Sequence, residues 1–266
     1  NITRFWNATA SISGMARGLQ LAQDYAQRRE AFGKKLADHP LHQRTLEELS
    51  ANVAGGLGLC LEVASLLGKV EAGTASDHEQ LYLRALVPVA KLTLGKQAVA
   101  HSSEILEAFG GAGYVEDTGL PRILRDAQVL SIWEGTTNVL SLDTLRALKQ
   151  DGVWDAYVGD VDARLDATSD SRLQAAVERS RSAVQHAGRW LGATLSERDL
   201  LEAGARRFAM TLGRATELAL LAQHAQWCLD HGKGERAMAA ARRFAKSRID
   251  LIDDDDFMGE SRLLVD

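Results

Sequence analysis

Long stretches of this chain contain no residue that would stop an α-helix. Only three prolines occur in 266 residues, at positions 40, 88 and 121, where average usage would give about thirteen. Apolar residues recur every three or four positions, for example at Ile12, Met15, Leu19, Ala22 and Tyr25, which is the spacing of a helix face buried in a core. A β-sandwich or barrel would need turn signals every ~8–12 residues. The pattern therefore predicts an all-α protein.

Short polar or glycine-containing links divide this pattern into separate helices. Gly33 is expected to cap the first helix, and Pro88 should kink the third helix or mark a local break. Helices longer than about 25 residues predict an up-down bundle. We interpret residues 1–150 as a four-helix-bundle unit and residues 151–266 as an appended helical unit. The expected helices cover residues 4–31, 41–73, 78–108, 122–129, 139–148, 171–193, 197–231 and 234–254.

Composition argues against several other classes of protein. The 31 basic and 36 acidic residues give a net charge of −5, which offers no general attraction to nucleic acid. No unbroken apolar run approaches the ~18 residues of a membrane span. Cys60 and Cys228 are too far apart to frame a disulfide scaffold, and the histidines lack metal-ligand spacing. We expect a cytoplasmic protein without a metal site, and the start at Asn1 suggests part of a longer protein.

The segment from residue 107 to residue 138 is rich in residues that can take part in chemistry. Gly110 and Gly111 would let the backbone approach a ligand closely, although a glycine cluster often only caps a helix. Glu134 lies in an apolar run, where loss of hydration would make it a better proton acceptor. Gly135 allows a turn, and Thr136 to Asn138 supply N–H donors of the kind that bind phosphate oxygens. The alternative is an ordinary helix start with a solvated glutamate.

A second candidate segment ends the first predicted helix. Arg28 and Arg29 stand together there, where arginines commonly bond the last helix carbonyls. A more specific interpretation makes Arg29 a diphosphate ligand, because a guanidinium presents a planar fork of donors. Phe32 would then form an apolar wall for a flat ring system.

Four short motifs occur together over some 110 residues. They are Tyr25…Arg29-x-x-Phe32-Gly33, Phe109-Gly-Gly-Ala-Gly-Tyr114, Arg125-Asp126-Ala127 and Trp133-Glu-Gly-Thr-Thr137. In this order and spacing they resemble the C-terminal helical domain of the acyl-CoA dehydrogenase family over residues 1–150. The segments Thr3–Trp6 and Asp38–Leu41 and the long helical tail look most like the branch that contains the alkylation-response proteins.

The resemblance implies FAD-dependent α,β-dehydrogenation of an acyl-CoA thioester. Glu134 would match the base that removes the α-proton while the β-hydride passes to flavin N5. Its backbone N–H would help to polarise the thioester carbonyl. Arg4 and Gly135 would match positions on the substrate side of the pocket.

The resemblance also implies a cofactor site and partners. Arg29 and Phe32 match residues that touch the FAD of a neighbouring subunit, so a homodimer or homotetramer is expected. The positions that match the surroundings of the FAD diphosphate and adenosine are Gly110, Gly111, Thr136 and Asn138. Electrons would pass to an electron-transferring flavoprotein.

This sequence departs from the family at several points. Glu107 and Pro40 stand where glutamine is usual near the flavin, and Thr3 stands where some members place the base. The family's N-terminal helical domain and middle β-domain do not occur here, so this chain alone should be a poor enzyme.

Two other hypotheses stay open from the sequence. One is a flavin-containing, DNA-associated alkylation-protection protein with little turnover, and the other is a non-catalytic oligomerisation fragment. The basic run from Arg236 to Arg248 supports DNA contact. A solvated helix face paired with the acidic run Asp253–Asp256 is the simpler interpretation.

Overall fold

The protein is almost entirely α-helical in the computed structural model, which describes residues 2–254 and residue 263. This confirms the predicted all-α class. The helices of the first half are α1 (Ile2–Arg28), α2 (Pro40–Glu71), α3 (Asp77–Ala108), α4 (Gly111–Tyr114), α5 (Pro121–Leu130) and α6 (Thr137–Leu148). Those of the second half are α7 (Val153–Asp166), α8 (Gln174–Thr194), α9 (Arg198–Asp230) and α10 (Arg236–Phe244). Two-residue strands, β1 (Glu30–Ala31) and β2 (Lys34–Lys35), form an antiparallel hairpin after α1.

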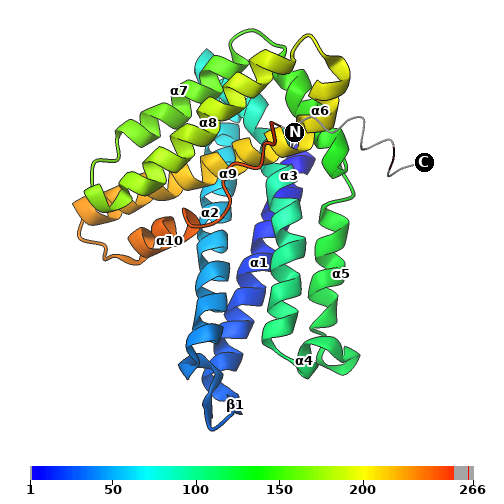
Figure 1. Cartoon of the computed structure of the whole chain (residues 1–266), viewed down its shortest axis with the longest axis vertical. Coiled ribbons are helices and arrows are strands. Elements are labelled where there is room, and N and C mark those ends of the chain that lie inside the picture. Colours follow the sequence, from blue (N-terminus) through cyan, green and yellow to red (C-terminus); the bar gives the residue numbers. More distant parts are fainter. Residues whose placement is uncertain (1, 255–262, 264–266) are drawn as a thin grey trace.

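Helices α1, α2, α3 and α5 lie side by side as an elongated bundle (Figure 1). Helices α6 to α9 gather at one end of this bundle, and the β1–β2 hairpin and α4 lie at the other end. Helix α9 packs against α2, α3 and α6, while α10 returns to pack on α2 and α9. The second half of the chain therefore packs directly against the bundle helices.

The ends of the bundle helices follow from local sequence. Ser76 accepts a hydrogen bond from the Glu79 N–H, and the Glu79 carboxylate accepts from the Ser76 N–H, so α3 begins with a capping box. Pro121 occupies the first turn of α5, where its missing N–H costs nothing. A β-carbon at Gly113 would overlap the Leu106 carbonyl oxygen, so the turn that follows α3 needs glycine there.

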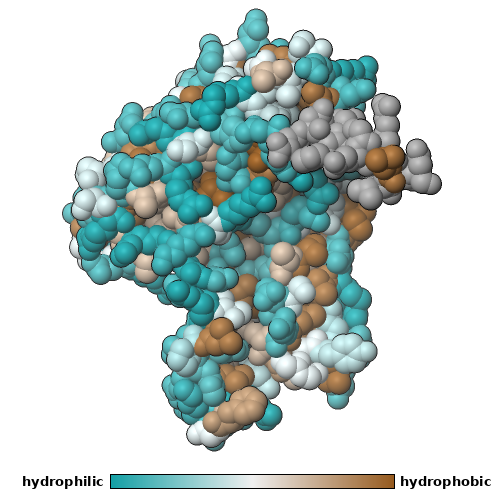
Figure 2. Space-filling model, viewed as in Figure 1, coloured by the Kyte–Doolittle hydropathy of each residue, from teal (hydrophilic) through white to brown (hydrophobic). Residues whose placement is uncertain are grey.

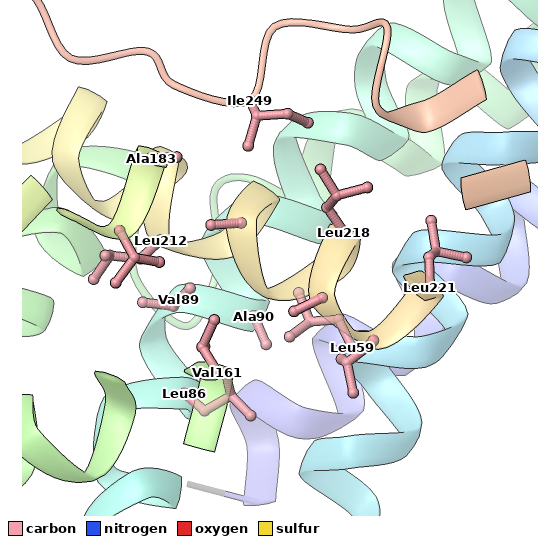
Figure 3. Close-up of a cluster of buried hydrophobic side chains, with 14 of the residues drawn as sticks. Leu59, Leu86, Val89, Ala90, Val161, Ala183, Leu212, Leu218, Leu221 and Ile249 are labelled. Carbon is pink, nitrogen blue, oxygen red and sulfur yellow. The ribbon is translucent and has the colours of Figure 1, made fainter. Parts of the chain in front are cut away.

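One hydrophobic cluster joins the two halves of the chain. Figure 3 shows Leu59, Leu86 and Val89 of the bundle facing Val161, Leu212 and Leu218 from helices beyond residue 150. Arg164 of α7 reinforces this junction, because it donates to Glu62 of α2 at 2.6 Å and to Gln223 of α9 at 2.8 Å. The two predicted units thus share a continuous core in this structure.

The structure differs from the predicted elements in four places. Helix α1 ends at Arg28, and Gly33 forms the hairpin turn with φ +81° instead of capping the helix. Helix α3 runs through Pro88 without a break. Residues 153–166 form α7, where the prediction had an acidic link. Helix α10 ends at Phe244 rather than at residue 254 because the segment beyond it bonds to other helices, for example the Leu251 N–H to Thr211.

Helix α2 is long and apolar enough, by length and composition, to cross a membrane. Of its apolar 18-residue segment, 33% is buried inside the protein. The core helix of a folded domain passes the same test, and α2 contacts α1, α3, α9 and α10.

A buried carboxyl group lies where α9 crosses α3. The Glu217 side chain is fully buried and accepts a hydrogen bond from Gln97 at 2.7 Å. Burial raises the pKa of Glu217 to about 7, although the Arg214 charge and the Gln97 hydrogen bond oppose the shift. The protein therefore takes on a buried negative charge as the pH rises through neutrality.

We expect a Glu217→Gln variant to be more stable than the wild type at pH 8, with a much smaller difference at pH 5. The folded-state pKa of Glu217 is about 7, above the ordinary value of 4.5. The wild type therefore loses stability as the pH rises from about 4.5 to about 7. The size of the effect is on the order of 3 kcal/mol. Urea unfolding at both pH values measures it, with Glu104→Gln on the exposed face of α3 as the control. Equal pH slopes for wild type and Glu217→Gln would contradict the prediction.

Candidate active site

Glu134 lies on a sharp turn between α5 and α6. Its φ is +58°, and Gly135 follows with φ +106°. A left-handed conformation costs a non-glycine residue about 1–2 kcal/mol. Among the described residues only Phe32 and Glu134 combine a side chain with a positive φ, and both are predicted site residues. Such strain persists only where the surrounding structure enforces it, and it is common at functional sites.

Contacts from two helices hold this turn. The Thr3 hydroxyl, on the first turn of α1, donates to the Glu134 carboxylate at 2.9 Å. Lys91 of α3 donates to the Gly135 carbonyl oxygen at 2.6 Å. Thr136 is the N-cap of α6, with its hydroxyl accepting from the Val139 N–H at 3.5 Å. Glu134 itself is exposed in this chain, so the loss of hydration that the sequence suggested would need groups from outside it.

An ion-pair network lies next to the turn. The Asp143 carboxylate of α6 is 8% exposed and contacts three guanidinium groups, those of Arg4, Arg84 and Arg146. Burial acts to raise the pKa of Asp143, but the hydrogen bond and charge of Arg4 and the charge of Arg84 outweigh it and hold the pKa below its ordinary value. Arg4 directly follows Thr3, which bonds to Glu134, and the Arg4 guanidinium is engaged by Asp143.

The remaining predicted cofactor residues lie at the opposite end of the bundle. Arg29 and Phe32 belong to the hairpin, and the Phe32 ring is 96% exposed. Tyr25 packs on Phe109 with ring centroids 4.9 Å apart, which brings the hairpin next to the Gly110–Gly111 segment. A β-carbon at either glycine would meet no atom within 4 Å, so their backbone borders open space.

The predicted residues thus form two separate groups. The first, which we name the base group, contains Arg4, Glu134, Gly135, Thr136 and Asn138. The second, the hairpin group, contains Arg29, Phe32, Gly110 and Gly111. Helix α1 connects them, because Thr3 touches Glu134 and the hairpin follows Arg28. At 1.5 Å per residue the 27 residues of α1 span about 40 Å.

Sequence reasoning missed three residues of the base group's surroundings: Lys91, Asp143 and the hydrogen-bonding role of Thr3. A signal for Lys91 was present, since it is the single charged residue in the apolar stretch 85–95. Asp143 offered none that distinguishes it from other acidic residues on an amphipathic helix. Over residues 2–254 and 263, no group of three or more His, Cys, Asp or Glu side chains is placed to hold a metal ion.

One arginine of the basic run near the C-terminus is engaged within the fold, whereas Arg236, Arg242, Lys246 and Arg248 are exposed. Arg243 is 12% exposed and contacts Glu48 of α2. Of the acidic run, Asp253 pairs with Arg207 at 2.7 Å and Asp254 accepts from His186 at 2.8 Å. The expected pairing between the two runs is therefore not seen for these two aspartates, and Asp255 and Asp256 lie outside the described residues.

Comparisons with known proteins agree with the motifs. Residues 1–149 match the family model "Acyl-CoA dehydrogenase, C-terminal domain", and residues 152–260 match "Acyl-CoA dehydrogenase 11 C-terminal domain-like". The chain belongs to the acyl-CoA dehydrogenase family, which confirms the predicted resemblance.

Individual relatives extend the match across both halves. Acyl-CoA dehydrogenase family member 11 of Caenorhabditis elegans is 43% identical over 85% of this chain and 38% of its own length. Putative acyl-CoA dehydrogenase AidB of Escherichia coli is 36% identical over 58% of this chain and 28% of its own length. The crystal structure of C. elegans ACDH-11 in complex with C11-CoA superposes with a TM-score of 0.88 at 41% identity, covering 95% of this chain and 43% of that one. The chain thus spans less than half the length of these relatives.

We expect Asp143→Asn to lower the free energy of unfolding by about 2 kcal/mol at pH 7. The variant leaves three guanidinium groups around an uncharged amide, and exposure of Arg146 and partial exposure of Arg4 moderate the loss. Because the folded pKa of Asp143 is depressed, its contribution is complete above about pH 4 and disappears as pH falls further. Urea unfolding at pH 7 and pH 3 measures the difference, with exposed Asp151→Asn as the control. A difference that grows toward pH 3 would contradict this assignment.

Proposed function

We propose that this chain is the C-terminal, base-carrying part of an FAD-dependent acyl-CoA dehydrogenase, with Glu134 as the base. The observation that carries the proposal is the left-handed turn, which two other helices hold and which presents an exposed carboxylate. Family membership gives the reaction class. The substrate is an acyl-CoA thioester, and the electrons pass on to an electron-transferring flavoprotein.

The residues present fit an FAD cofactor. In the hairpin group, Arg29 is exposed and offers a guanidinium fork to a diphosphate, while exposed Phe32 offers a ring face. Tyr114, at the end of α4, is also exposed. In the base group, Thr136 is the N-cap of α6 and Asn138 lies on its first turn, where N–H groups point outward. When bound, FAD supplies the hydride acceptor.

The chain's own residues perform the proton step. Glu134 takes the α-proton of the thioester, and the Thr3 hydroxyl fixes one of its carboxylate oxygens while leaving the other free. The backbone N–H of Glu134 is available to polarise the thioester carbonyl, as a preorganised donor on a rigid turn. Arg4 adds positive charge on the substrate side, held in place by Asp143.

An apolar surface surrounds the turn and suits a covering partner. Ile132, Trp133 and Val139 are each more than half exposed, and Val129 is 48% exposed. Figure 2 shows hydrophobic side chains gathered over α3 and α5 on the same side of the molecule. We infer that other domains of the same protein cover this face, exclude water and so strengthen the base.

The distance between the two residue groups supports a shared cofactor site between subunits. A span of about 40 Å along α1 separates the base group from the hairpin group. We infer that the hairpin group of one subunit contacts the FAD whose flavin lies at the base group of its neighbour. A homodimer or homotetramer satisfies this requirement.

A Glu134→Gln variant of the full-length enzyme should retain FAD and lose flavin reduction by acyl-CoA at least 1000-fold, because glutamine cannot accept the proton. Loss of the flavin absorbance band after mixing with short- and long-chain acyl-CoA measures reduction, and the band before mixing reports bound FAD. Glu116→Gln, an exposed glutamate paired with Arg125 away from the turn, is the matched control. An unchanged rate in Glu134→Gln would refute the assignment of the base.

Mixing two inactive subunits tests the inter-subunit site. We expect an Arg29→Ala/Phe32→Ala subunit and a Glu134→Gln subunit each to be inactive alone. In a mixed dimer, one of the two sites receives a wild-type hairpin from one subunit and a wild-type base from the other, so about half of the wild-type activity per dimer should return. Differently tagged subunits allow purification of the mixed species. No recovery in that species would show that both groups serve the same site within one chain.

A further inference from the structure

Lys91 is a buried cation that the proton step above does not use. Its side chain is 1% exposed, in the middle of α3, with apolar neighbours before and after it in the sequence. Within the described residues the ammonium makes one hydrogen bond, to the Gly135 carbonyl oxygen at 2.6 Å, and no ion pair within 4.0 Å. A lysine is rarely so buried unless it has a specific partner.

Helix α3 contacts the turn that carries Glu134 at two positions, Lys91 and Gly95. Gly95 lies four residues after Lys91 and thus on the same helix face. A β-carbon at Gly95 would lie 3.2 Å from the Leu130 carbonyl oxygen, at the end of α5. Helix α3 therefore contacts the backbone immediately before the turn through Gly95 and immediately after Glu134 through Lys91.

The turn has a conformation that needs such support. Glu134 and Gly135 both have positive φ, and peptides relax readily out of this region unless neighbouring groups hold them. A hydrogen bond from a charged donor to a carbonyl is stronger than a neutral one, and burial strengthens it further. The Lys91 bond acts on the peptide unit that directly follows the carboxylate-bearing residue.

Two charges act on Lys91, those of Arg4 and Glu134. Burial and the positive charge of Arg4 on α1 lower the pKa of Lys91 to about 8, while the Glu134 carboxylate opposes them. Asp143 on α6 is neutralised by contacts with Arg4, Arg84 and Arg146. Glu134 is therefore the carboxylate whose charge acts on Lys91, and removal of this charge should lower the pKa of Lys91 further.

We propose that Lys91 is a positioning residue for the base: by donating to the Gly135 carbonyl oxygen, it fixes the turn that presents the Glu134 carboxylate. This role rests on the proposed function of Glu134, which it deepens. Lys91 does not touch the substrate. It acts through the backbone, so that the carboxylate meets the α-proton in one orientation.

The test compares Lys91→Met with Lys96→Met in the full-length enzyme with bound FAD. Methionine keeps the length and burial of the stem but removes the donor, and Lys96 lies on the same helix with no hydrogen bond to the turn. We expect Lys91→Met to slow flavin reduction 10- to 100-fold at saturating acyl-CoA, with KM changed less than threefold. Lys96→Met should match the wild type within twofold. A Lys91→Met rate within twofold of wild type would overturn the proposal.

Two further readouts separate positioning from general stability. Hydrogen–deuterium exchange should rise in Lys91→Met within residues 131–139 and stay unchanged in α2 and α9. Exchange that rises equally everywhere would indicate a purely structural role and overturn the proposal. The wild-type reduction rate should also change with a midpoint near pH 8, the pKa of Lys91, and this step should vanish in Lys91→Met. A step that persists in the variant belongs to another group and counts against Lys91.

The same measurements distinguish failure of this inference from failure of the proposed function. If no acyl-CoA reduces the wild-type flavin, the dehydrogenase assignment fails, while local exchange in Lys91→Met still reports whether Lys91 holds the turn. If wild type is active and the exchange of residues 131–139 is unaffected by Lys91→Met, the dehydrogenase assignment stands and the positioning role is refuted.

Discussion

Burial of α3 is the constraint on which this structure depends. The helix contacts α1, α2, α5, α6, α7 and α9, and its middle is enclosed on all sides, with Leu86, Ala90 and Leu94 almost fully buried. A helix that is hydrophobic all round must lie inside a protein. The bundle supplies some of its cover, and helices beyond residue 150 supply the rest. The one charge in this buried stretch, Lys91, is turned toward the strained turn that carries Glu134.

Two non-glycine residues with a left-handed backbone conformation lie at opposite ends of the bundle, and both carry exposed side chains. Phe32 has φ +50° in the hairpin and Glu134 has φ +58° beside α6. Each conformation turns a side chain outward that a relaxed backbone would place elsewhere. An exposed aromatic ring and an exposed carboxylate on a strained turn do not stabilise an isolated domain. They can contribute to a site that another subunit or domain completes. Both features fit the proposed site, in which the hairpin group of one subunit and the base group of its neighbour contact the same cofactor.

The sequence was sufficient to predict the long helices, but not where the candidate site residues would lie relative to one another. Apolar periodicity and the Gly110–Gly113 cluster located α1, α2 and α3 within a few residues. Helix α7 was missed because its acidic residues resembled a link, although Val153, Tyr157, Val161 and Leu165 form a stripe at helical spacing. The end of α10 depends on tertiary bonds to Thr211 and His186, which no local signal reveals.

The helices beyond residue 150 have a physical role that requires no chemistry of their own. Helix α9 packs on α3 and α6. Helix α3 bonds to the turn that carries Glu134 through Lys91, and α6 begins directly after this turn. Tyr157 of α7 donates to the Leu212 carbonyl oxygen of α9 at 2.8 Å, and Arg164 ties α7 to α2. A turn held against its conformational preference is only as rigid as the elements that hold it. The second half of the chain is therefore best understood as a support that keeps α3 and α6 fixed around Glu134.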